Sequence, residues 1–317
     1  MTQKAKEQQQ PTAIPNPLHE VFGFPPDMID EEALRYRNSK YCPFGNGRSR
    51  HCTKSKATDP IGVCSIYRDN TATITCPVRF RQNGLIGNHT SAFFFQGIKN
   101  PDFRLLTEVK LRDAAGNPVG IIDAVVVRLE NGRIVDYGAV EVQGTYISGN
   151  VTNPFKKYMS DQVANATMLW PKKSAPRADY LSSSRKRLVP QLLYKGRILK
   201  SWNRKIAVVV DQPFFKDLFR ITPFEHLQDP VCADMAWFIY GLQRDEARTQ
   251  YTLTLNNVVY TEFLKTLERI NTPISGDESQ FIKQLQSRID AGELSGIPEE
   301  VELTPDLDAP VTFDNNE

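Results

Sequence analysis

Long apolar runs and a strong net charge are both missing from this sequence of 317 residues. Apolar stretches such as residues 92–95 and 206–210 are far too short to cross a bilayer. The first ten residues lack the apolar core of a signal peptide. We therefore expect a soluble, cytoplasmic protein that has no membrane partner.

The net charge is only +2, but the charges are unevenly distributed along the chain. Residues 151–205 carry 13 lysines and arginines against two acidic residues, whereas residues 206–317 carry 8 basic and 20 acidic residues. A concentrated basic segment is typical of proteins that bind a polyanion, most simply nucleic acid. The alternative is a solvated basic helix face that the acidic C-terminal region balances.

The composition divides the chain into four segments, and 40% apolar residues are enough for a real core. Residues 1–18 are polar and contain three prolines, so we expect a flexible arm. Residues 19–90 contain four cysteines in an irregular stretch. Residues 91–296 contain the main strand and helix patterns, and we expect a globular core that ends in a helical part. Residues 297–317 are acidic, and we expect a disordered tail.

Strand and helix patterns alternate along the chain. Strands are predicted at 105–111, 119–127, 135–143, 205–210 and 250–259. Helices are predicted at 26–37, 159–170, 182–202, 229–248, 260–271 and 277–291, with Pro190 interrupting the third. Asn131 and Gly132 are a strong hairpin signal, so the second and third strands should pair antiparallel. The pattern predicts an α/β (α+β) fold in which helices flank a mixed central β-sheet.

Three consecutive predicted strands each carry an acidic residue, namely Glu108, Asp123 and Glu141. Asp123 interrupts an otherwise apolar strand, where an unpaired carboxylate would be costly to bury. Glu141 and Gln143 point to the same face because side chains alternate along a strand. Carboxylates held together on a rigid sheet suit Mg²⁺, so these residues are the candidate active site. The alternative is that the acids simply face solvent.

Four of the five cysteines lie within 35 residues, at Cys42, Cys52, Cys64 and Cys76. In a cytosolic protein such clustering favours a metal over disulfides, and four thiolates suit a tetrahedral zinc or iron ion. Four unrelated buried thiols and a pair of disulfides are the alternatives. Cys232 stands alone in a predicted apolar helix, and we expect a packed core thiol there.

Cys42 belongs to the run YCPFGNG at residues 41–47, and Glu141 and Gln143 belong to the run EVQ. Together with Asp123 and the three later cysteines, these runs resemble the NotI-type restriction endonucleases, a branch of the PD-(D/E)xK nuclease superfamily. The resemblance covers residues 40–210. It implies a PD-(D/E)xK nuclease-like core behind an N-terminal, four-cysteine metal-binding loop region.

The resemblance also implies a role for each polar residue of the candidate active site. Asp123 and Glu141 would bind Mg²⁺, and Glu108 would be an additional acidic position. Gln143 stands where most members of the superfamily have lysine. Because its amide carries no charge, Gln143 can orient an attacking water but cannot take its proton. The four-cysteine site of the family is associated with iron, so the resemblance favours iron over zinc.

The implied function is that of a type II restriction endonuclease, which cleaves both strands of DNA with Mg²⁺ at a specific, GC-rich palindrome. A palindrome calls for a homodimer, because the symmetry of the protein must match that of the site. The candidate DNA contacts are Lys156, Lys157, Lys172, Lys173, Arg185, Lys186, Arg187, Arg48 and Arg50. Two alternatives remain open: a non-catalytic, metal-stabilised DNA-binding protein, and a repair or structure-selective nuclease of the same superfamily.

Overall fold

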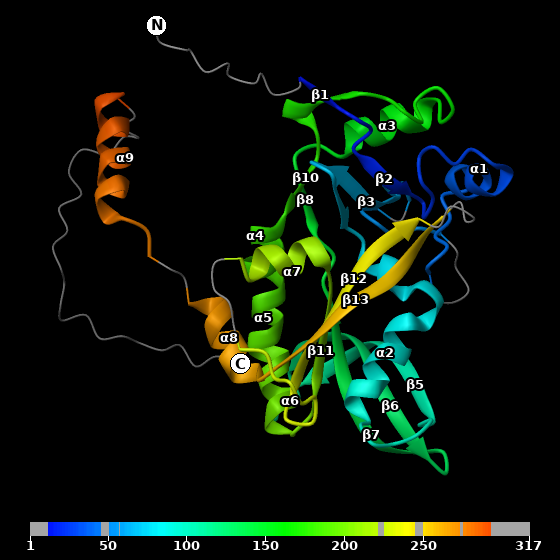
Figure 1. Cartoon of the computed structure of the whole chain (residues 1–317), viewed down its shortest axis with the longest axis vertical. Helices are drawn as coiled ribbons and strands as arrows, with labels where there is room; N and C mark the ends of the chain where they lie inside the picture. Colours follow the sequence, from blue (N-terminus) through cyan, green and yellow to red (C-terminus); the bar gives the residue numbers. More distant parts are fainter. Residues whose placement is uncertain are drawn as a thin grey trace, which may run out of the picture. The chain divides into compact units, whose positions relative to one another are not determined.

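A computed structural model describes residues 12–45, 51–56, 58–220, 225–244, 250–272 and 275–292. Arg48, Arg50, most of the predicted arm and the predicted acidic tail lie outside these residues. The chain divides into two units, Met1–Thr272 and Pro273–Glu317. In the second unit, helix α9 (Glu278–Asp290) is exposed along its length and confirms the helix predicted at 277–291 (Figure 1).

The centre of the first unit is a six-stranded sheet with the order β13-β12-β11-β7-β6-β5. Its strands are β5 (Phe103–Arg112), β6 (Pro118–Glu130), β7 (Arg133–Val142), β11 (Ile206–Asp211), β12 (Met235–Arg244) and β13 (Tyr251–Thr261). Strand β11 pairs parallel with β7 and β12, whereas the other neighbours pair antiparallel. The predicted mixed sheet of an α+β fold is therefore confirmed.

The turn between β6 and β7 forms where the sequence predicts a hairpin. Asn131 and Gly132 both have positive φ, at 51° and 75°. Two consecutive residues in this conformation match the right-handed twist of the paired strands, and an Asn-Gly pair adopts it at little cost. The antiparallel pairing of β6 with β7 is confirmed.

Strand β12 contradicts the helix predicted at 229–248. It pairs with β11 on one side and β13 on the other, and its residues 235–240 are all buried. A strand covered on both faces shows no alternation of apolar and polar residues, so its pattern resembles that of a buried helix. The run Trp-Phe-Ile-Tyr at 237–240 is rich in strand-forming residues, and this composition is the signal that favours a strand.

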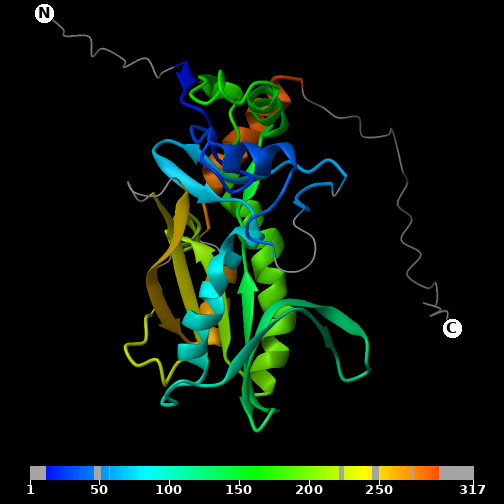
Figure 2. The same cartoon turned by 90° about the vertical axis from the view of Figure 1, so that its right-hand side faces the viewer.

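Helices cover both faces of the sheet (Figure 2). On one face lie α7 (Gln212–Leu218), α8 (Phe263–Asn271) and a long helical stretch from Tyr180 to Ser201. That stretch consists of α4 (Tyr180–Ser183), η3 (Ser184–Leu188), α5 (Val189–Gln191), η4 (Leu192–Gly196) and α6 (Arg197–Ser201). The other face carries η1 (Pro77–Gly84) and α2 (Leu85–Phe94).

The long helix runs through Pro190 without a break in its helical backbone angles. The π-helical segments η3 and η4 lie on either side of this proline. Proline lacks an N–H group, and its ring crowds the preceding turn of a regular α-helix. The wider π turns relieve that crowding, which explains why Pro190 does not end the helix.

A second layer of short elements lies at one end of the sheet (Figure 1). It contains a three-stranded sheet of β2 (Leu18–Val21), β3 (Val63–Arg68) and β4 (Thr71–Ile74). Two short pairs join β1 (Ala13–Ile14) to β9 (Trp170–Pro171) and β8 (Tyr146–Ser148) to β10 (Arg177–Asp179). The remaining elements are α1 (Glu31–Asn38), α3 (Thr152–Ser160) and η2 (Lys172–Ser174).

Two helices of this layer differ from their predicted bounds. Helix α1 begins at Glu31 because the Asp30 side chain accepts a hydrogen bond from the backbone N–H of Ala33 (2.8 Å), which caps the helix. The helix predicted at 159–170 is wrong, because α3 ends at Ser160 and residues 162–167 form turns. Asp161 accepts hydrogen bonds from the next turn, and the Asn165 side chain donates to the carbonyls of Lys157 and Asp161.

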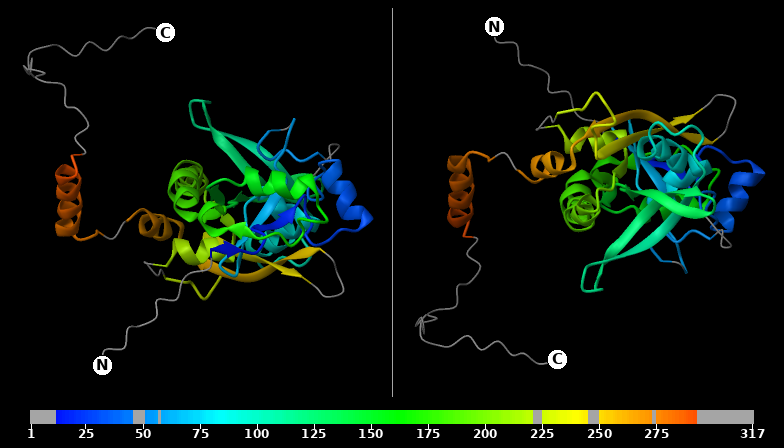
Figure 3. Two further views of the ribbon diagram at one scale, coloured as in Figure 1. Left: turned by 90° about the horizontal axis from the view of Figure 1, so that it is seen from above. Right: turned by 90° about the horizontal axis from the view of Figure 1, so that it is seen from below.

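The hairpin of β5 and β6 projects from the rest of the sheet (Figure 3). Within the described residues, no helix is long and apolar enough to span a membrane.

Candidate active site

The strand register places Asp123 and Glu141 next to each other. Ala124 of β6 pairs with Val140 of β7 in an antiparallel ladder, so continuing the register by one residue brings Asp123 opposite Glu141. Directly opposed residues of neighbouring strands point to the same face. The backbone N–H of Val142 also donates to Asp123 Oδ2 at 2.8 Å. The two acids therefore meet at the carboxyl end of β7.

The Glu141 carboxyl group lies in a strongly desolvated position, with only 2% of the residue exposed. Burial raises the pKa of Glu141 to about 8, although the Lys195 ammonium opposes this shift and the Asp123 carboxyl group adds to it. The two carboxyl groups lie close enough to hydrogen-bond when one of them is protonated. Glu141 Oε1 is buried and has no hydrogen-bond partner within the described residues.

Lys195 is the residue of this site that the sequence analysis missed. Its Nζ donates to Glu141 Oε2 (2.6 Å), to the Ile121 carbonyl (2.7 Å) and to Gln191 Oε1 (3.1 Å). Leu188, Leu192 and Leu199 form the buried face of the same helix, and Lys195 falls on that face at the helical spacing. A lysine on an otherwise apolar helix face was the signal that could have identified it.

Glu108 lies on the other side of Asp123. Thr107 pairs with Ala124 and Val109 with Ile122, so the register of β5 and β6 brings Glu108 opposite Asp123. Glu108 and Asp123 also line the same cavity of about 250 Å³, next to Arg81. The Glu108 side chain is 71% exposed and forms an ion pair with Arg81 (3.5 Å). An exposed pair of this kind contributes at most about 1 kcal/mol, so Glu108 can change partner readily.

Gln143 is buried at the end of β7 and does not line this cavity. Its Nε2 donates to the carbonyl of Gly144 (2.6 Å), and its backbone N–H donates to the carbonyl of Val209 (2.9 Å). The structure therefore places Gln143 beside the acid pair, with its amide nitrogen engaged by the backbone.

The four clustered cysteines lie near one another, and three of them lie near Lys54. Cys52, Cys64 and Cys76 are buried, and Cys42 is half-buried. Burial raises the pKa of Cys42, of Cys52 (to about 11) and of Cys64, and the charge of a Cys76 thiolate raises each of them further. Lys54 Nζ, also buried, donates to Thr75 Oγ1 (2.8 Å) and lies in the field of three of the thiols.

The described part of the chain contains no group of three or more His, Cys, Asp or Glu side chains in the arrangement of a metal site. Cys232 also differs from its prediction. It is exposed in a turn before β12 and donates weakly to Asp229, so it is not a core thiol. The prediction was wrong because it assumed a helix in this segment.

The candidate DNA contacts that the structure describes lie on three elements. Lys156 and Lys157 are exposed on α3. Arg185, Lys186 and Arg187 are exposed on η3, with the Arg187 guanidinium over the Tyr146 ring at 4.1 Å. Lys172 and Lys173 belong to η2.

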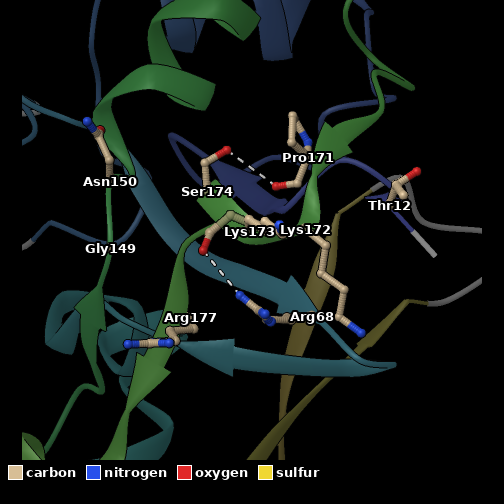
Figure 4. A pocket seen from close by; sticks show the side chains of 10 residues that line it. Thr12, Arg68, Gly149, Asn150, Pro171, Lys172, Lys173, Ser174 and Arg177 are labelled. Carbon is tan, nitrogen blue, oxygen red and sulfur yellow. Dashed lines mark hydrogen bonds between the residues drawn. The ribbon is translucent and has the colours of Figure 1, made fainter. Parts of the chain in front are cut away.

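Lys172 and Lys173 line a cavity of about 680 Å³ together with Arg68 of β3 and Arg177 of β10 (Figure 4). Asp69 lies near two of these cations, 3.4 Å from Arg68 and 3.7 Å from Lys172. The described residues that line the cavity include four cations and no acidic side chain, so the cavity is basic. We call it the basic cavity. Sequence analysis missed Arg68 because it lies far from the basic segment in the chain; Arg177 belongs to that segment but was not singled out.

Comparison with known proteins identifies the family. The family model of the restriction endonuclease NotI matches residues 27–253, which is more than half of the chain. The match includes the four clustered cysteines, the three acids and Gln143. A search of curated proteins found no match. The resemblance predicted from the sequence is confirmed, and the chain belongs to the NotI restriction endonuclease family of type II enzymes, which cleave DNA at specific sites.

Proposed function

We propose that this enzyme hydrolyses DNA phosphodiesters with Mg²⁺ and that Asp123 and Glu141 bind the ion. The observation that carries the proposal is the pair of facing carboxyl groups, with Glu141 Oε1 buried and without a donor among the described residues. When both carboxyl groups are ionised, as metal binding requires, Asp123 is only an acceptor and cannot satisfy that oxygen. A hard cation with oxygen ligands fits between the two groups.

Bound Mg²⁺ would polarise the scissile phosphate and lower the pKa of a water molecule. Asp123 and Glu141 hold their positions because strands β6 and β7 fix both backbones. If the Glu108 side chain breaks its ion pair with Arg81, its carboxylate can also bind the ion, and the Arg81 guanidinium can approach a phosphate. Gln143 donates through Nε2 to Gly144, which leaves its amide oxygen as the atom that can orient an attacking water.

We assign the basic cavity and the exposed cations of α3 and η3 to the DNA backbone. Lysine and arginine contacts to phosphates position a duplex without reading its sequence. Gly149 lines the basic cavity six residues after Gln143, so the chain between them spans at most about 20 Å. One turn of B-DNA measures about 34 Å. The acid pair and the basic cavity can therefore contact the same turn of a duplex.

For the cysteine cluster we propose one iron or zinc ion held by Cys42, Cys52, Cys64 and Cys76. The mutual proximity of the thiols supports this proposal. The Lys54 ammonium supports it as well, since it would compensate the negative charge of four thiolates around a divalent ion. The side chains would have to close together to bind the ion. Elemental analysis of the purified wild-type protein and of Cys64→Ser tests the site directly.

The family match supports a specific site, and a palindrome is the arrangement that a homodimer reads. We propose a homodimer and a GC-rich palindromic site. Sedimentation of the protein with and without DNA measures the first, and sequencing of the cleaved ends measures the second.

Digestion of genomic and plasmid DNA tests the proposed function. We expect discrete fragments with Mg²⁺ and intact DNA with EDTA, and the fragment ends should share one sequence. A smear would indicate a nuclease without site specificity. Intact DNA at every divalent ion tested would contradict the proposed chemistry.

A further inference from the structure

Lys195 extends from the long helix toward β6 and β7 and is only 5% exposed. Its ammonium group has three donors, and all three are used, by Glu141, by the Ile121 carbonyl and by Gln191. Three acceptors in different directions fix the position of Nζ. The ammonium is therefore held in place rather than free to follow a ligand.

Stability alone gives no reason for a charge at this position. The neighbours of Lys195 on its helix face are leucines of the main core. A buried ion pair is generally no more stabilising than apolar side chains of the same volume, because both ions lose their hydration. A buried pair that borders a carboxylate cluster is instead typical of a functional site.

The ion pair determines which oxygen of Glu141 is available. Lys195 binds Oε2 at 2.6 Å, whereas Oε1 has no partner within the described residues. If the carboxylate rotated, Oε2 would lose its charge-assisted hydrogen bond. The lysine therefore holds the carboxylate in the orientation that leaves Oε1 open beside Asp123.

Near the acid pair, the strand that carries Glu141 provides no cation, because Arg133, its basic residue, lies at the opposite end of β7. Gln143 is neutral and donates to the Gly144 carbonyl, and Arg81 pairs with Glu108. The helix approaches closely enough to provide one instead. A Cβ atom at Gly120 of β6 would lie 3.4 Å from Lys195 Cδ, an ordinary contact distance, so the lysine stem passes directly against this strand. Lys195 also lies in the π segment η4, and such segments are frequent at functional sites.

We propose that Lys195 is a positioning residue of the catalytic centre, whose ammonium fixes the Glu141 carboxylate through Oε2 and so presents Oε1 to the divalent cation. This inference rests on the proposed function, because it concerns the same acid pair. In this proposal Lys195, on the long helix, provides the positive charge of the catalytic centre, because the side chain of Gln143 is neutral.

The test is the Mg²⁺ dependence of cleavage by Lys195→Met, which keeps a long side chain but removes the charge. We expect the Mg²⁺ concentration for half-maximal cleavage to rise about 10- to 100-fold, as when a residue that orients a metal ligand is lost. Mn²⁺ binding without DNA, followed by electron paramagnetic resonance, should weaken by a similar factor. Thermal unfolding should show a folded protein.

Two further variants separate positioning from packing. Gln191→Leu removes one acceptor of Lys195 without touching the acid pair, and we expect a smaller weakening of Mg²⁺ and Mn²⁺ binding. Lys200→Met is the matched control, because Lys200 lies on the same helix and pairs with a different carboxylate, Asp234. Its Mg²⁺ and Mn²⁺ dependence should equal that of the wild type.

The outcomes distinguish this inference from the proposed function. Wild-type protein that does not cleave DNA contradicts the proposed function. In that case, weaker Mn²⁺ binding by Lys195→Met than by the wild type still supports the role of Lys195, and equal binding overturns it. Wild-type protein that cleaves, with unchanged metal dependence in Lys195→Met and Gln191→Leu, overturns the inference alone. If Lys195→Met fails to fold, Gln191→Leu provides the test: weaker Mg²⁺ and Mn²⁺ binding supports the inference, and wild-type binding overturns it.

Discussion

At the scale of single residues, charge and burial determine which parts of the site are visible in the sequence. Asp123 is recognisable because it interrupts an apolar strand, and Glu141 because it opens a short polar run. Lys195 was not identified, because it is one of 13 basic residues in the segment 151–205, and only its spacing from Leu188, Leu192 and Leu199 separates it from the other cations. Its partner Glu141 is 54 positions away in the chain, so only the fold brings them together.

His19 gives a pH-dependent prediction. Burial, followed by the charges of Arg79 and Arg244, lowers the pKa of His19 from 6.5 to about 4. The folded state therefore binds this proton more weakly than the unfolded state does. Its contribution to stability is complete above pH 6.5 and is lost as the pH falls toward 4. The shift corresponds to at most about 3 kcal/mol.

Urea unfolding at pH 7 and pH 4 measures this effect, with His19→Gln as the comparison. Glutamine does not titrate and can keep a hydrogen bond with Ser65, which lies 3.1 Å from His19 Nδ1. We expect the free energy of unfolding to fall less for His19→Gln than for the wild type over this range. Equal losses in both proteins would show that His19 does not contribute to acid sensitivity.

At the scale of elements, long-range pairing explains most differences between prediction and structure. The Asn131-Gly132 hairpin was predictable because its signal is local. Strand β12 was not, because its continuous apolar run reflects packing on both faces of the sheet, with Trp237 in one core cluster and Phe238 in the other. The continuous helix through Pro190 was also missed, since π segments have no recognisable sequence pattern.

The packing of α2 on the sheet predicts opposite effects for two glycines. A Cβ atom at Gly138 of β7 would lie 2.3 Å from the Phe94 ring, and Phe94 is buried. Gly138→Ala should therefore destabilise the protein by about 1–3 kcal/mol. A Cβ atom at Gly87 of α2 would meet its nearest neighbour at 3.6 Å, an ordinary contact.

Gly87→Ala should stabilise the protein by up to about 1 kcal/mol, because alanine favours a helix more than glycine does. Chemical denaturation of both variants measures the two changes on one helix–sheet interface. Effects of the same sign would mean that α2 packs on the sheet differently from this structure, in which Gly138 faces Phe94 and Gly87 faces Phe103 and Leu105 of β5.

At the scale of the whole molecule, the uneven charge distribution was visible in the sequence, but the basic cavity was not. Lys172 and Lys173 were predicted as DNA contacts from the basic segment alone. Arg68 joins them through β3, more than 100 positions earlier in the chain. Family membership supports DNA as the partner, and the cavity provides a place for its phosphates.

The salt dependence of DNA binding tests the basic cavity. Replacing both Lys173 and Arg177 by glutamine removes two cations, so the slope of log K against log salt should become shallower by up to about two. Fluorescence anisotropy with a duplex in EDTA measures the slope without cleavage. Lys265→Gln, an exposed lysine of α8, is the control and should leave the slope unchanged. A wild-type slope in the double variant would exclude phosphate contacts at this cavity.

The most direct test of the central claim is single-turnover cleavage by Asp123→Asn and Glu141→Gln in saturating Mg²⁺. Both substitutions keep the size of the side chain and remove the charge that binds the ion. We predict a loss of at least about 1,000-fold in the rate, as expected when several kcal/mol of transition-state stabilisation are removed, with DNA binding in EDTA retained. Cleavage by either variant within tenfold of the wild-type rate would contradict the assignment of the active site.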